Sequence, residues 1–134
     1  MGQIQITAVD ERDSSWEDRE PRFRVYLHTS GADDTHGSTS THDLLGVDIL
    51  QAIDWAQRQA GDSRTYAIAL VWDDSQRELE TPGDGRGLVW LVGMDGNETP
   101  QDEGALAVQR RMLARRDRPV VLSEADRLPP RSPV

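Results

Sequence analysis

The first third of the chain alternates apolar with polar positions, which is the period of a β-strand. Residues 3–9 alternate in this way and predict a half-buried strand. Residues 22–28 follow Pro21 with a cleaner pattern, in which Phe23, Val25 and Leu27 are expected to face the core. Residues 30–40 are rich in Gly, Asp, Ser and Thr and predict a loop. Residues 41–47 are expected to return as a third strand that pairs with the second.

The next segment changes to helical spacing. Asp48 can cap a helix, and Gln51, three residues later, completes the pattern of a capping box. Gly61 is suited to end the helix. The apolar residues between these signals recur on one face, and they are Ile49, Ala52, Ile53, Ala56 and Ala60.

Two nearly continuous apolar runs follow, at residues 65–72 and 87–94. Each is short enough for a buried strand, and the polar segment 73–86 between them contains the turn sequence Pro82-Gly83. We therefore expect two antiparallel neighbours joined by a long hairpin loop.

A second helix is predicted after Thr99, which can cap it, with Pro100 in the first helical position. Pro119 is expected to end this helix, and residues 120–122 are expected to form a short edge strand. The proline-rich residues 128–134 are predicted to be a tail.

The order of these elements is β-β-β-α-β-β-α. Consecutive strands favour antiparallel pairing, so the pattern predicts the α+β class. We expect a single domain over residues 1–127, with a mainly antiparallel sheet of about five strands and two helices on one of its faces.

Composition narrows the classes of function. The 134 residues carry a formal net charge of −9 with a sequence pI near 4.7, which disfavours nucleic acid and anionic lipid as partners. Cysteine is absent, so disulfides, thiolate metal sites and a cysteine nucleophile are excluded. The sequence has no apolar run near the roughly 20 residues of a membrane helix and no signal-peptide pattern at its start. We therefore expect a cytoplasmic protein without a membrane partner.

Three histidines fall within fifteen residues and form the sharpest chemical cluster. If the loop folds back between paired strands, His28, His36 and His42 converge with Asp33 or Asp34 on a zinc, iron or manganese ion. Their spacing matches no compact metal motif. A polar surface loop with no metal is the competing interpretation.

Other motifs carry less information. The sequence has no Gly-x-Ser-x-Gly elbow, and its glycine-rich segment 83–87 lacks the lysine of a phosphate-binding loop. A local positive patch accompanies the second helix, but no aromatic residues are interleaved with its arginines, as a nucleic-acid platform would require. These arginines are Arg110, Arg111, Arg115, Arg116 and Arg118.

Trp16 stands apart from the other tryptophans because polar and acidic residues surround it in sequence. A tryptophan among carboxylates is typical of an interface anchor whose acidic neighbours steer a basic partner. The competing interpretation is a loop tryptophan that folds back over a sheet edge. A second acidic group lies between the two apolar strands. The predicted partner-binding residues are Trp16, Glu17, Asp18, Asp73, Asp74, Glu78, Glu80 and Asp84.

These features favour a non-catalytic acidic module that neutralises or regulates a basic protein partner, as an immunity protein, antitoxin or inhibitor does. No catalytic residue and no cofactor are assigned. The first alternative is a small metal-dependent hydrolase or metal-binding protein that uses the histidine cluster. The second is a structural or assembly component. The sequence leaves the oligomeric state open.

Overall fold

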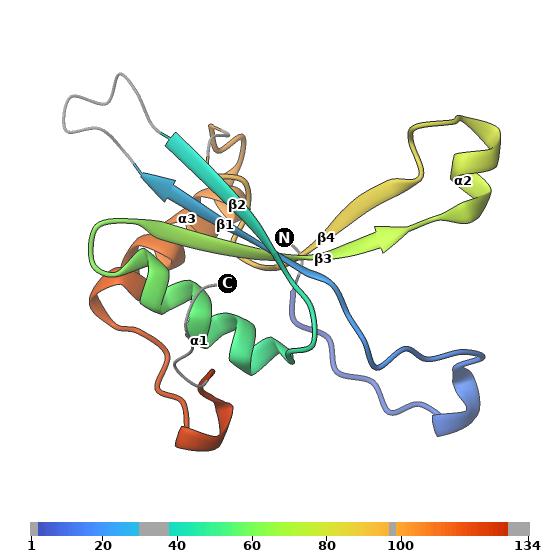
Figure 1. Ribbon diagram of the computed structural model, residues 1–134, viewed down its shortest axis with the longest axis horizontal. Helices are drawn as coiled ribbons and strands as arrows, with labels where there is room; N and C mark the ends of the chain where they lie inside the picture. The colour runs from blue at the N-terminus through green and yellow to red at the C-terminus, as the bar shows by residue number, and fades with distance from the viewer. Residues whose placement is uncertain (1–2, 30–37, 97–98, 129–134) are drawn as a thin grey trace.

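The computed structural model describes residues 3–29, 38–96 and 99–128. Its centre is one antiparallel sheet with the strand order β2-β1-β3-β4 (Figure 1). The strands are β1 (Phe23–Thr29), β2 (Ser38–Leu44), β3 (Thr65–Asp73) and β4 (Arg86–Val92). The predicted α+β class and the predicted pairing of 22–28 with the strand that follows are confirmed, as is the β3–β4 hairpin.

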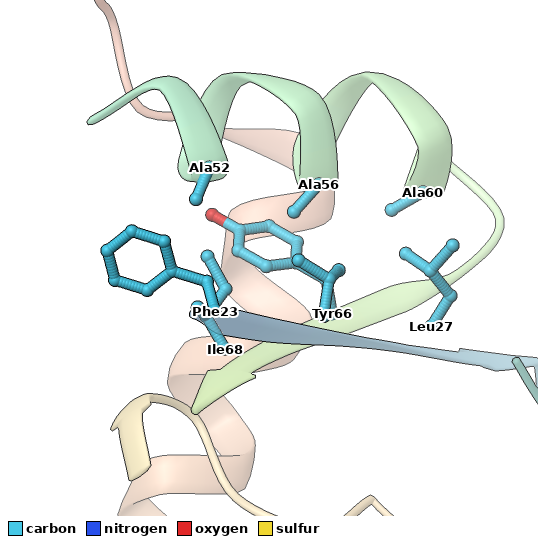
Figure 2. Packing of buried hydrophobic residues seen from close by; sticks show 8 residues of the cluster. Phe23, Leu27, Ala52, Ala56, Ala60, Tyr66 and Ile68 are labelled. Carbon is cyan, nitrogen blue, oxygen red and sulfur yellow. The ribbon is translucent and has the colours of Figure 1, made fainter. Parts of the chain in front are cut away.

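Helix α1 (Ile49–Ala60) covers one face of the sheet. Its alanines at positions 52, 56 and 60 point at the strands, where Val25 and Ile68 are fully buried (Figure 2). Because alanine side chains are small, the helix approaches the sheet closely. The predicted apolar face of this helix is therefore confirmed, with Ile49 and Ile53 packed at the margin of the core.

Helix α3 (Glu103–Asp117) lies on the opposite face, which corrects the expectation of two helices on one face. Its buried residue Met112 lies beside Ala67, whose side chain points away from the α1 side because neighbours in a strand alternate. A Cβ built on Gly93 would lie 3.1 Å from the Ala67 Cβ and 3.2 Å from the Met112 Cγ. In Figure 2 α1 lies above the strands and the orange helix α3 extends below them. The physical reason is that β3 is apolar on both sides, so both faces need cover.

Two predicted strands are wrong. Residues 3–9 form no strand, and the side chains of Ile4 and Ile6 are 91% and 93% exposed. Residues 120–122 form no strand either. Alternation of apolar and polar residues shows that a segment can form a strand, but a strand also needs a neighbouring strand to pair with. The described residues therefore form four strands, where about five were expected.

The helix boundaries follow their caps. The Asp48 carboxylate accepts from the Gln51 amide at 2.9 Å, and the Gln51 side chain accepts from the Asp48 amide at 3.0 Å, so the predicted capping box is confirmed. Gly61 ends α1 as predicted, with a φ of 59°. The cap predicted for the second helix is wrong: Asp102 caps α3 by accepting from the Ala105 amide at 2.7 Å, three residues beyond Thr99.

The connection between β3 and β4 and the chain after α3 contain structure that their polar sequences did not predict. The segment predicted as a plain hairpin loop includes a short helix, α2 (Ser75–Glu80). After α3, the chain returns along α1, where the Gln57 side-chain amide pairs with both the amide and the carbonyl of Val120 at 3.0 and 2.8 Å. The Leu128 amide then donates to Asp54 at 2.8 Å. Of the predicted tail, residues beyond Leu128 lie outside the described part. No described helix is long and apolar enough to cross a membrane.

Candidate partner-binding surface

The ring of Trp16 lies against the ring of Trp72, with centroids 5.1 Å apart and planes tilted by 37°. Trp72 is near the end of β3, so the N-terminal segment passes beside that end of the sheet. Both side chains nevertheless remain accessible, with 62% of Trp16 and 41% of Trp72 exposed. Trp16 therefore folds back onto the sheet and still exposes an aromatic surface, so the structure is compatible with both interpretations, a covering tryptophan and an interface anchor.

An open hollow of about 660 Å³ lies beside this pair. We call its acidic and aromatic lining, Trp16, Asp18, Glu20, Trp72 and Asp73, the tryptophan–acid surface. Predicted partner-binding residues from two segments more than fifty positions apart thus line one hollow, with Trp16 and Asp18 from the first and Asp73 from the second. Glu17 is exposed beside it in sequence.

The negative charge of the protein is concentrated at this end. Residues 10–20 and 73–84 together contain eleven acids and three arginines, a net −8 of the chain's −9. Figure 1 shows the first segment and the β3–β4 hairpin extending from the same end of the sheet in diverging directions. The rest of the protein is close to neutral.

The acids of the hairpin also have structural partners. Asp73 pairs with Arg86 through two hydrogen bonds of 2.8 and 3.2 Å, and this contact lowers the pKa of the Asp73 carboxyl. Asp74 caps α2 by accepting from the Arg77 amide at 3.0 Å. Glu78 accepts from the amides of residues 83 and 85 at the hairpin tip. These three acids therefore shape the hairpin whether or not they meet a partner.

The remaining predicted residues are less constrained. Glu80 accepts from the Gln76 amide group at 3.0 Å, one turn earlier in α2. Asp18 accepts from the Glu20 backbone amide at 2.8 Å, which fixes a turn beside Trp16. Glu17 and Asp84 are exposed. Of the predicted partner-binding acids, Glu17 and Asp84 are therefore the most available for intermolecular contact.

The sequence analysis missed a second cluster, on the sheet face opposite α1. Tyr26 and Trp90 lie with ring centroids 5.0 Å apart, and Trp90 is 37% exposed. Beside them Arg24 holds Asp43 through two hydrogen bonds of 2.7 and 3.0 Å, and this pairing lowers the pKa of the Asp43 carboxyl. The sequence could indicate part of this cluster, because alternation places the even-numbered residues of 22–28 together on one face of β1. Trp90 joins that face only through the pairing of β4 with β3.

The histidine cluster is divided by the sheet. His28 pairs with Thr39 and His42 with Val25, so the two imidazoles point to opposite faces. His28 is 7% exposed, its Nε2 accepts from the Gly96 amide at 3.2 Å, and burial lowers its pKa. His42 instead packs edge-on against Trp55.

These two histidines cannot bind one ion together. The other proposed ligands, His36 and Asp33, lie outside the described residues. Within the described ranges, no group of three His, Asp or Glu residues is arranged to hold a metal ion.

Comparison with known proteins gives one partial similarity. Over 84 residues, 63% of this chain, the sequence is 34% identical to formate–tetrahydrofolate ligase of Maricaulis maris (strain MCS10). The matched segment makes up 14% of that enzyme, so the chain spans only a small part of its length. No family model matches the sequence, and no solved structure matches the fold.

Proposed function

We propose that this protein is a non-catalytic binding module that neutralises or regulates a basic protein partner through the tryptophan–acid surface. The observation that carries the proposal is an exposed tryptophan pair whose hollow is lined by three acids, at the end of the sheet from which the two most acidic segments extend. Aromatic anchors supply most of the binding energy of many interfaces, while surrounding charge sets the rate of encounter and the choice of partner.

The N-terminal segment supports this function. Its apolar side chains, among them Ile4 and Ile6, are exposed, although their alternation is typical of a strand. A segment with strand periodicity and no strand partner among the described residues is suited to pair with another chain. It leads directly into Trp16, so an extended partner could contact both.

The enzyme that shares partial similarity acts, by its name, on formate and tetrahydrofolate. The similarity covers 14% of its length. Because the chain matches so small a part of that enzyme, its chemistry is not carried over to the tryptophan–acid surface.

The test is a comparison of single variants in partner capture from an extract of the native host. Trp16→Ala removes the exposed anchor, while Val121→Ala, a 93% exposed residue outside the surface, is the matched control. The proposal predicts one near-stoichiometric basic protein on the unmodified chain and on Val121→Ala, released by salt and absent from Trp16→Ala. Equal recovery on all three, or no partner at all, contradicts it.

A further inference from the structure

At the other end of β3, an arginine cluster surrounds a small hollow of about 170 Å³ between the C-terminal ends of α1 and α3. We define the arginine cluster as Arg64, Arg115 and Arg116. All three line this hollow together with Tyr66, Gly61 and Pro119. Trp72 lies six positions after Tyr66 along β3, or about 20 Å at 3.3 Å per residue, so this hollow is distinct from the tryptophan–acid surface.

The charges of the cluster are not balanced by neighbouring acids. Among the described residues, ion pairs join other arginines to carboxylates, but none includes a member of the cluster. The nearest acids in sequence, Asp62 and Asp117, are exposed and do not line the hollow. The three arginines themselves are half-buried. Partly desolvated like charges are costly unless an opposite charge joins them.

The helix ends account for only part of this charge. Each helix C-terminus is equivalent to about −0.5 of an elementary charge, so two termini offset about one of the three positive charges. Arg64 also donates to the Gln59 carbonyl near the end of α1, which fixes the position of its side chain. The residues that line the hollow therefore carry an excess of positive charge.

We propose that this hollow binds a small oxyanion, either free phosphate or the phosphoryl group of a small phosphomonoester, held by the arginine cluster. The hollow, at about 170 Å³, has room for such a group, and the negative charge of the group is opposite to that of the lining arginines. Guanidinium groups bind phosphate oxygens through paired, charge-assisted hydrogen bonds.

The test is calorimetric titration of the full chain with inorganic phosphate, at an ionic strength held constant with chloride. Arg115→Gln should weaken binding by about tenfold or more, since a hydrogen bond to a charged group is lost. Arg110→Gln, which removes an exposed charge from the same helix, should leave the affinity unchanged. Arg115→Lys keeps the charge without the paired donors, so it should fold like the parent and still bind less tightly.

A parallel titration with glycerol phosphate identifies the source of the anion: tighter binding than inorganic phosphate indicates a phosphomonoester, and weaker binding indicates the free ion. The proposal is overturned if phosphate gives no more heat or thermal shift than chloride. It is also overturned if Arg110→Gln and Arg115→Gln reduce binding equally.

Discussion

Replacing Glu78 by alanine should loosen the tip of the β3–β4 hairpin. The two carboxylate oxygens of Glu78 accept from the Gly83 amide at 2.8 Å and from the Gly85 amide at 3.0 Å. Gly85 is buried against this side chain, so close that a Cβ built on it would lie 2.6 Å from the Glu78 Cβ. One side chain therefore holds both glycine amides at the turn.

Hydrogen bonds to charged groups contribute about 1.5–3 kcal/mol each when shielded from water. Because Glu78 is exposed, we discount each to about 1 kcal/mol, which gives a loss of about 2 kcal/mol in the free energy of unfolding. For a chain of this length, that loss corresponds to a decrease on the order of 5–10 °C in Tm.

Hydrogen exchange followed by NMR is the assay, because it reports on the Gly83 and Gly85 amides individually. Both should exchange faster in Glu78→Ala, alongside the lower Tm. Glu80→Ala is the control, since that carboxylate accepts one exposed bond from Gln76 within α2. If protection at the two glycines is unchanged, or if both variants behave alike, then Glu78 does not hold the tip.

Three further expectations concern the core, a helix cap and a titrating group. Ile68→Ala removes a fully buried side chain beneath α1 and should cost about 2–5 kcal/mol in urea unfolding, whereas an unchanged midpoint would show that the site is not packed. Asp48→Ala removes half of the capping box and should cost about 1 kcal/mol by thermal melting, and no loss would mean that α1 does not depend on this cap. Burial lowers the pKa of His28 below its ordinary 6.5, so the unfolded chain binds the proton first as pH falls. Stability should therefore decrease as pH falls through the window just below 6.5, and His28→Gln should flatten that part of a chemical-denaturation series. A parent chain with a flat profile there would contradict the burial of a neutral imidazole.

Much of the fold was predictable because local signals agreed with tertiary structure. The cap at Asp48, the stop at Gly61 and the apolar runs of β3 and β4 are properties of short segments, and each segment adopts the expected structure. The placement of α3 was not predictable in this way. It depends on Met112 meeting Ala67 across the sheet, which no local pattern encodes.

The candidate site was predictable in composition but not in geometry. Acidity and the isolation of Trp16 are visible in the sequence, whereas its contact with Trp72 depends on the path of an extended segment that contains one short 3-10 helix, Glu11–Asp13, and no strand. The structural duties of Asp73 and Glu78 also emerge only when Arg86 and the glycine amides are placed. The arginines near the end of α3 are visible in the sequence as a positive patch. Arg64 and Tyr66 come from another part of the chain and line the same hollow only in the folded protein.

Recognition of a basic partner through the tryptophan–acid surface is tested by the affinity of the captured partner for a charge-reversed chain, measured at low and high salt. Glu17→Arg with Glu20→Arg reverses two exposed acids beside Trp16, and Asp62→Arg with Glu124→Arg is the matched control elsewhere on the surface. If acids beside Trp16 attract the partner, the Glu17→Arg, Glu20→Arg variant should lose much of its affinity at low salt. The loss should be smaller at high salt, where charges are screened, and the control variant should change little. Equal affinities for the two double variants would contradict recognition through the tryptophan–acid surface.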